Sequence, residues 1–142
     1  MNVRKRTYAV VCMLTALLFM PACTNSPEEN LIGEWQAEEP ETGTTISLLF
    51  DEDGTMTATR ETNDERISAR GTWALYSDPT PMHLDFTLRG TSGETVTRKT
   101  IIRFVSKDEI EMRRSAGSGS RPEGFPDDDD GNTGDIFTLR RQ

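Results

Sequence analysis

Apolar and polar residues alternate along most of the chain after residue 30, and this period of two is typical of half-buried β-strands. The alternation is clearest from Arg66 to Leu75, where every second residue is apolar or glycine. Turn residues such as Asp53-Gly54 interrupt it about every ten residues, and no segment shows the longer period of a helix. The pattern predicts one all-β domain over residues 31–142.

The predicted strands begin near residue 31 and then span residues 45–50, 55–59, 66–75, 82–89, 96–106, 110–114 and 135–141. About eight strands joined by short turns predict an antiparallel up-and-down meander, which curls into a small barrel or half-barrel. Closure of the sheet would remove the free strand edges that invite aggregation.

The sequence Gly-x-Trp occurs twice, at Gly33-Glu34-Trp35 and at Gly71-Thr72-Trp73. Residues two apart in a strand face the same side, so each glycine leaves room beside its tryptophan. We expect the large inward residues to form either a ligand cavity or a packed core: Trp35, Phe50, Trp73, Leu75, Leu84 and Phe86. Core packing is favoured for the tryptophans, because burying one aromatic side chain removes about 150–250 Å² from water.

Residues 1–22 have the organisation of a secretory signal peptide, with three basic residues at positions 4–6 before an apolar run, Tyr8–Met20. The run is shorter than the roughly 20 residues that a transmembrane helix needs. Its end, Met20-Pro21-Ala22-Cys23, resembles a bacterial lipoprotein signal. The resemblance implies that Cys23 is diacylated and becomes the new N-terminus. The alternative is an ordinary cleavage after Ala22 that leaves a free thiol.

Residues 23–30 would then be a lipidated cysteine and a flexible tether, since Thr24–Asn30 contains no apolar residue and one proline. Acyl chains contribute about 0.8 kcal/mol per buried methylene, so several of them hold a protein on a membrane where one does not. We expect secretion through the inner membrane and a lipid anchor at the cell envelope. In a bacterium with two membranes, Thr24 in place of aspartate favours the outer membrane, at its periplasmic face or at the cell surface.

Acidic residues outnumber basic ones by 24 to 16, a net charge of −8. Removal of residues 1–22 leaves 13 basic residues against 24 acidic ones, a net charge of −11. Such a surface repels nucleic-acid phosphates, so we expect no nucleic-acid partner. Cys12 lies in the apolar run and is removed with it. The processed chain therefore has no disulfide, and its fold depends on its core.

Catalytic motifs are missing from the sequence. His83, the single histidine, is two residues from Asp85, so both side chains face the polar side of one predicted strand. A His–Asp pair can orient a catalytic base, but no nucleophile accompanies it, and hydrolase, zinc-peptidase and nucleotide-binding spacings are absent. We expect a surface ion pair or hydrogen bond at His83, no catalytic residues, no enzymatic activity and no cofactor.

Residues 115–134 form an irregular acidic loop before the last strand. Within it, Arg121, Pro122 and Phe125 predict either a binding motif or a latch that keeps the loop on the body. The latch is favoured, with Phe125 capping one barrel end and Arg121 meeting a carboxylate. Asp127–Asp130 do not fit the EF-hand spacing, so a solvated loop is favoured over weak cation binding, and we expect no metal site.

Several short motifs together resemble bacterial lipocalin-like domains, and in particular an uncharacterised planctomycete-type secreted family. They are the two Gly-x-Trp strands, Asp53-Gly54, Leu84-Asp85, Arg121-Pro122 with Phe125, and Arg140-Arg141. The resemblance covers about residues 31–141 and departs from the family at Trp73, where tyrosine is usual. It implies a lipocalin-like barrel, and it implies no activity, because the activity of that family is unknown.

Two functions fit these observations. The first is a membrane-anchored lipoprotein whose non-catalytic domain binds a small apolar ligand or lipid between the large inward residues. The second is a protein-interaction lipoprotein, such as an enzyme inhibitor or an envelope assembly factor. That function would use the acidic exterior and the 115–134 loop to bind an envelope protein.

Overall fold

A computed structural model describes residues 25–39, 42–114, 120–126 and 136–142. Its elements are α1 (Pro27–Leu31), β1 (Gly33–Glu39), β2 (Thr44–Phe50), β3 (Thr55–Glu61), β4 (Arg66–Tyr76), β5 (Met82–Arg89), β6 (Thr95–Ser106), β7 (Glu109–Arg114) and β8 (Ile136–Arg141). In these residues no helix is long and apolar enough to cross a membrane. The predicted signal peptide, Cys23 and Asp127–Asp130 lie outside the described residues.

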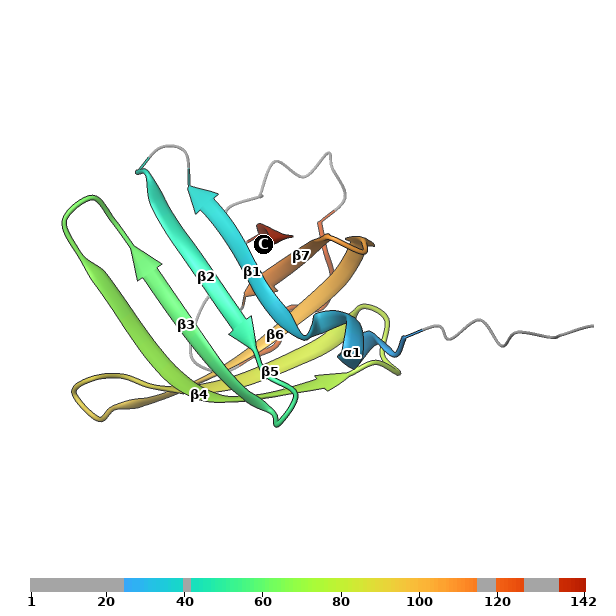
Figure 1. The fold of residues 1–142 in the computed structure, drawn as a ribbon. Coiled ribbons are helices and arrows are strands. Elements are labelled where there is room, and N and C mark those ends of the chain that lie inside the picture. Colours follow the sequence, from blue (N-terminus) through green and yellow to red (C-terminus); the bar gives the residue numbers. More distant parts are fainter. Residues whose placement is uncertain (1–24, 40–41, 115–119, 127–135) are drawn as a thin grey trace, which may run out of the picture.

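Each strand pairs antiparallel with the next one along the chain (Figure 1). The last strand, β8, pairs antiparallel with β1. The closing contact is short: Trp35 is opposite Arg141, Gln36 is opposite Arg140, and Gln142 N–H donates a 3.0 Å hydrogen bond to the carbonyl oxygen of Glu34. The all-β class and the up-and-down meander of eight strands are therefore confirmed. The sheet is a closed barrel and not a half-barrel.

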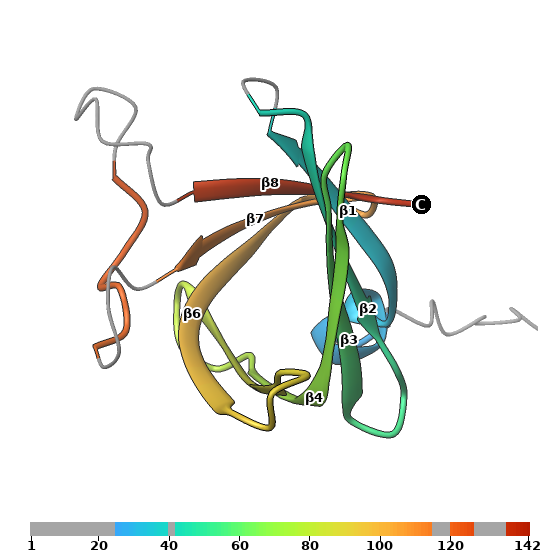
Figure 2. The same cartoon turned by 90° about the vertical axis from the view of Figure 1, so that its left-hand side faces the viewer.

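The two ends of the barrel differ. One carries the β3–β4 and β5–β6 turns, and we call it the open end; Figure 2 looks into the barrel from this side. The other carries α1 and the β2–β3 and β4–β5 turns, and we call it the closed end (Figure 1). The hydrophobic core lies toward α1, so the position of this helix shows which half of the barrel is filled.

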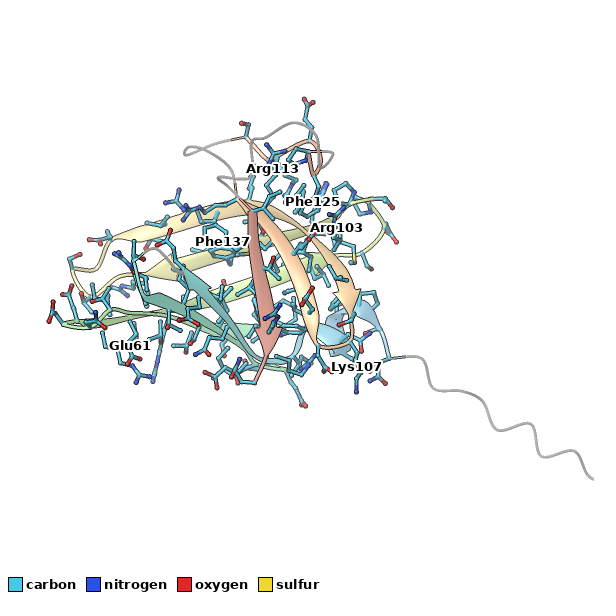
Figure 3. The ribbon with its side chains drawn as sticks, turned by 90° about the horizontal axis from the view of Figure 1, so that it is seen from above. Glu61, Arg103, Lys107, Arg113, Phe125 and Phe137 are labelled. Carbon is cyan, nitrogen blue, oxygen red and sulfur yellow. The ribbon has the colours of Figure 1, made fainter. Side chains whose placement is uncertain are left out.

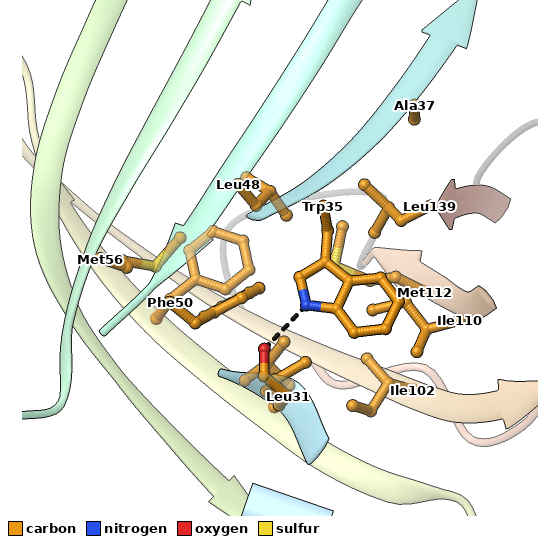
Figure 4. Close-up of a cluster of buried hydrophobic side chains, with 12 residues drawn as sticks. Leu31, Trp35, Ala37, Leu48, Phe50, Met56, Ile102, Ile110, Met112 and Leu139 are labelled. Carbon is orange, nitrogen blue, oxygen red and sulfur yellow. Dashed lines mark hydrogen bonds between the residues drawn. The ribbon is translucent and has the colours of Figure 1, made fainter. Parts of the chain in front are cut away.

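Large side chains fill the closed half. Trp35 from β1, Phe50 from β2 and Met56 from β3 are almost completely buried, and Leu31 of α1 packs with them (Figure 4). Leu84 of β5 is completely buried in the same cluster. Their strand positions follow the alternation of the sequence, because every second residue faces inward. At about 25 cal/mol per Å² of apolar surface, each of these side chains contributes on the order of 1.5–3 kcal/mol.

The closed end is held by hydrogen bonds as well as by packing. The indole Nε1 of Trp35 donates a 2.7 Å hydrogen bond to the carbonyl oxygen of Leu31 (Figure 4). The guanidinium of Arg141 lies 4.3 Å from the centre of the Trp35 ring. It also donates hydrogen bonds to the carbonyl oxygens of Asn30 and Ile32. Trp35 and Arg141 thus fasten α1 across this end.

A flexible tether was predicted to extend to residue 30, but this is wrong for its last residues, which form α1. Ser26 caps the helix: its hydroxyl accepts a hydrogen bond from Glu29 N, and its own N–H donates to the Glu29 carboxylate. Pro27 occupies the first turn, where the missing N–H has no helical partner to lose. This capping box, together with the burial of Leu31, makes residues 26–31 part of the folded body.

Protein atoms fill the room beside both tryptophans. Gly33 has a φ of 121°, which favours glycine, and a Cβ there would lie 2.8 Å from a guanidinium nitrogen of Arg141. At Gly71 a Cβ would lie 1.7 Å from the backbone oxygen of Thr87 in β5. Neither glycine therefore opens space for a ligand.

The turn between β2 and β3 contains a carboxylate with a lowered pKa. The hydroxyl of Thr55 donates to Asp53 at 2.6 Å and its N–H donates at 2.9 Å, so together they hold the pKa of Asp53 below its ordinary 3.8. A lowered folded-state pKa stabilises the fold above the unfolded-state value, and this contribution is lost as the pH falls through the folded-state pKa.

Replacing Thr55 with valine removes the hydroxyl and keeps the N–H. We expect the pKa of Asp53 to rise toward 3.8 in this variant, measured by NMR titration of the carboxyl carbon. Thr57→Val is the matched control, because Thr57 is on the same face of β3 and makes no described hydrogen bond to Asp53. Identical titration curves for wild type and Thr55→Val would contradict the assignment.

Candidate ligand cavity

A cavity of about 370 Å³ occupies the open half of the barrel. All eight strands contribute to its wall, which is mostly apolar. The lining residues are Ala37, Ile46, Leu48, Ala58, Ile67, Ala69, Phe86, Leu88, Gly90, Glu94, Val96, Arg98, Met112, Arg114, Phe137 and Leu139. Ile67 and Val96 are 44% and 37% exposed although their strand positions face inward, so they mark the mouth.

Small side chains create this space. In three strands the inward residue is large in the closed half and alanine in the open half: Trp35 and Ala37 in β1, Met56 and Ala58 in β3, Trp73 and Ala69 in β4. Ala58 and Ala69 lie directly opposite each other in the β3–β4 pair, so their methyl groups leave a continuous gap. The change from large to small residues along these three strands therefore divides the barrel into a packed half and a hollow half.

Of the six large residues predicted for a cavity or core, only Phe86 lines the cavity. The others pack in the core or against it: Trp35, Phe50, Trp73, Leu75 and Leu84. The ring of Trp73 packs edge-on against Phe50 with centroids 5.5 Å apart, and its Nε1 donates a 3.1 Å hydrogen bond to the carbonyl oxygen of Asp51. Both tryptophans are thus outside the cavity wall.

Two arginines interrupt the apolar wall. Arg98 of β6 faces inward opposite Phe86, and Arg114 of β7 faces inward opposite Thr100. The guanidinium of Arg114 lies 4.9 Å from the centre of the Phe137 ring. Neither arginine forms an ion pair with another residue that the structure describes. Neither arginine was predicted as a site residue from the sequence, although both stand at positions that the alternation assigns to the interior.

Residues 120–126 lie on the outer wall over β5, β6 and β7. Nη2 of Arg121 lies 2.6 Å from a carboxylate oxygen of Asp85, and its Nη1 donates a 2.7 Å hydrogen bond to the carbonyl oxygen of Thr100. Arg113 of β7 donates to the carbonyl oxygen of Gly124. Arg121 thus meets a carboxylate, and the segment is fastened at two points.

Phe125 packs against the guanidinium of Arg103, 4.5 Å from the ring centre, on the outward face of β6 (Figure 3). Its expected position over a barrel end is therefore wrong: the segment covers a side of the barrel. Pro122 is half-buried in the same segment. Ile101 is completely buried although it alternates with inward residues of β6, because this segment lies over its face of the strand.

Asp85 has a structural partner in this arrangement. It shares the outward face of β5 with His83, but its carboxylate meets Arg121. The described part of the chain contains no group of three or more His, Cys, Asp or Glu side chains that could hold a metal ion. The cavity is consequently the feature of the described residues with the clearest capacity to bind a ligand.

The fold and the cavity define a class: a small, closed, antiparallel meander barrel with an apolar cavity at one end and a packed core at the other. Comparison of the chain with protein-family models, with curated proteins and with solved structures found no match. The class therefore rests on the geometry, and the resemblance to lipocalin-like domains stays a prediction.

Proposed function

We propose that the protein is a non-catalytic binding protein of the cell envelope, anchored through a lipidated Cys23, whose barrel holds a small apolar ligand or lipid. The observation that carries the binding function is the cavity of about 370 Å³ in the open half. Ligand pockets usually have volumes of about 300–1,000 Å³, with mostly apolar walls and a few polar groups. This wall has that composition, and its volume favours a ligand at the small end of the range.

The position of α1 on the closed end is compatible with a membrane anchor at Cys23. Only a few residues separate Cys23 from Pro27, which begins the helix on the closed end (Figure 1). At roughly 3.5 Å per residue, that stretch reaches at most about 14 Å. An anchor at Cys23 would hold the closed end near its membrane and direct the cavity away from it. The ligand would then enter from the aqueous compartment, or from a partner in it.

A neutral fluorescent probe tests the binding function. N-phenylnaphthylamine, which emits strongly in apolar surroundings, is titrated into the purified protein. We expect saturable fluorescence in the wild type and at least about tenfold weaker binding in Ala69→Phe, because the larger ring fills the cavity between β3 and β4. Native mass spectrometry of the same sample should show small molecules that purify with the protein.

The matched control is Ala74→Phe. Ala74 lies on the same strand but is exposed on the outer face, so this variant adds the same ring without entering the cavity. It should bind the probe as the wild type does. Equal binding by the Ala69→Phe and Ala74→Phe variants, or no saturable binding by the wild type, would contradict a ligand function for the cavity.

The alternative, a protein-interaction lipoprotein, depends on the loop of residues 115–134, of which the structure describes residues 120–126. Arg121 and Phe125 hold that described part against the barrel wall. Pull-down from envelope extracts with the full chain and with a loop-deleted variant separates the two functions. Loss of all partners on deletion is expected only for the interaction function.

A further inference from the structure

We propose that the ligand is an amphiphile with one apolar chain and one anionic head group, and that Arg98 and Arg114 hold the head. This inference rests on the proposed binding function and specifies its ligand class. The apolar residues of the cavity would surround the chain, and the two guanidinium groups would bind the head group at the wall formed by β6 and β7.

The register of the sheet brings the two arginines to one place. Arg114 lies opposite Thr100 in the β6–β7 pair, and Arg98 is the next inward residue of β6 toward the open end. The two arginines are therefore diagonal neighbours on one face, with Cα atoms about 7–8 Å apart. Side chains as long as arginine can converge from this spacing on a single carboxylate or phosphate, which the planar guanidinium binds through two hydrogen bonds.

The ring of Phe137 restricts the movement of the Arg114 guanidinium. This ring, on the neighbouring strand β8, lies under the guanidinium with 4.9 Å between Cζ and the ring centre, and both residues line the cavity. A cation over an aromatic face is attracted by about 0.5–1 kcal/mol even at exposed sites. A guanidinium that is held in place loses less conformational entropy when it binds an anion.

The described cavity wall carries more positive than negative charge, whereas the chain as a whole is negative. The full sequence has a net charge of −8, yet among the residues that the structure describes the cavity is lined by two arginines and one carboxylate, that of Glu94. Glu94 closes the β5–β6 turn: its carboxylate accepts a hydrogen bond from the Ser92 hydroxyl, and its carbonyl oxygen accepts one from Gly90 N–H. Arg98 is half-buried among apolar residues, where a charge without a partner is costly, and no residue that the structure describes forms an ion pair with it. An anionic head group would supply that partner.

Calorimetry with two ligands of equal chain length tests the inference. Dodecanoate and 1-dodecanol differ in their head groups, and each is titrated into the protein at neutral pH, dodecanoate below its micelle-forming concentration and dodecanol below its solubility limit. We expect wild-type protein to bind dodecanoate at least about tenfold more tightly than dodecanol, and this preference to weaken as salt is added. In Arg98→Gln/Arg114→Gln the preference should disappear, while the affinity for dodecanol changes by less than about threefold.

Arg70→Gln/Arg89→Gln is the matched control. These two arginines lie opposite each other in the β4–β5 pair, are exposed on the outer face, and their replacement changes the net charge by the same amount. This variant should keep the preference for dodecanoate. Equal affinities of the wild type for both ligands, or a preference that survives in the Arg98→Gln/Arg114→Gln variant, overturns the inference and leaves the apolar binding function standing. Failure of the wild type to bind either ligand overturns both.

Discussion

Replacing Trp35 with alanine is expected to lower the free energy of unfolding by about 3–5 kcal/mol, the usual range for a buried tryptophan. The side chain has no exposed surface and contacts three parts of the closed end. It donates to the carbonyl oxygen of Leu31, packs edge-on to Phe104 with centroids 6.5 Å apart, and lies under the guanidinium of Arg141. Removing it leaves a large space and releases α1 at the same time.

Trp73→Ala is the matched control for this prediction, because both tryptophans belong to a Gly-x-Trp strand. Trp73 is only half-buried, so its loss should cost about half as much. Urea unfolding of both variants, followed by circular dichroism, gives the comparison. Equal losses of unfolding free energy in the two variants would contradict the conclusion that Trp35 holds the closed end together.

A milder variant separates the hydrogen bond of Trp35 from its packing. Trp35→Phe keeps most of the ring but leaves the buried carbonyl oxygen of Leu31 without its donor, which costs on the order of 1–3 kcal/mol. This variant also provides a measurement if Trp35→Ala does not fold.

The strands and their inward faces could be predicted from the sequence because alternation is a local signal. A strand such as β4 shows it in its own residues, with Ile67, Ala69, Gly71, Trp73 and Leu75 on one face. Closure could not be predicted in the same way. It depends on a few contacts, such as those of Trp35 with Arg141 and Gln36 with Arg140, between the first and last strands of the domain. Sequence alternation specifies which face a residue occupies, but it does not specify which distant strand will pair.

The large inward residues did not indicate where the cavity lies, because five of the six that were predicted for a cavity or a core belong to the core or pack against it. A cavity lies where side chains are small, so Ala37, Ala58 and Ala69 carried the signal. Each alanine is uninformative alone, and the gap appears only when the register places Ala58 opposite Ala69. The same applies to Arg98 and Arg114. They were ordinary charged residues in the sequence, and the strand pairing made them neighbours on the inner face.

The helix α1 was missed although its signal was present. Ser26-Pro27-Glu28-Glu29 is a capping box with proline in the first turn, followed by the apolar residue Leu31. The polar composition of Thr24–Asn30 instead predicted a flexible tether. A five-residue helix is not stable by itself, because helix nucleation is unfavourable. It forms here because the barrel end buries Leu31 and Trp35 bonds its carbonyl oxygen, and neither contact is visible in the sequence of the helix alone.

Gly71→Ala is expected to destabilise the protein by more than about 3 kcal/mol, above the 1–3 kcal/mol that overpacking usually costs. A Cβ at this position would lie 1.7 Å from the oxygen and 2.7 Å from the carbon of the Thr87 carbonyl, and 2.9 Å from Cα of Leu88. These are backbone atoms of β5, so they cannot move away as a flexible side chain would. Relief of the clash requires β4 and β5 to separate where their pairing holds the barrel together.

Gly124→Ala is the matched control, because none of the described residues beyond its chain neighbours lies within 4 Å of the added methyl group, and its effect should stay within about 0.5 kcal/mol. Urea unfolding measures both variants, and an unchanged midpoint for Gly71→Ala would contradict the close approach of β4 and β5. The expected loss has a consequence for the cavity. Gly71 lies on β4 between Trp73, which packs against the core, and Ala69, which lines the cavity. The close approach of β4 to β5 at Gly71 therefore sets the positions of both side chains. A folded Gly71→Ala variant should therefore bind N-phenylnaphthylamine more weakly than Gly124→Ala does.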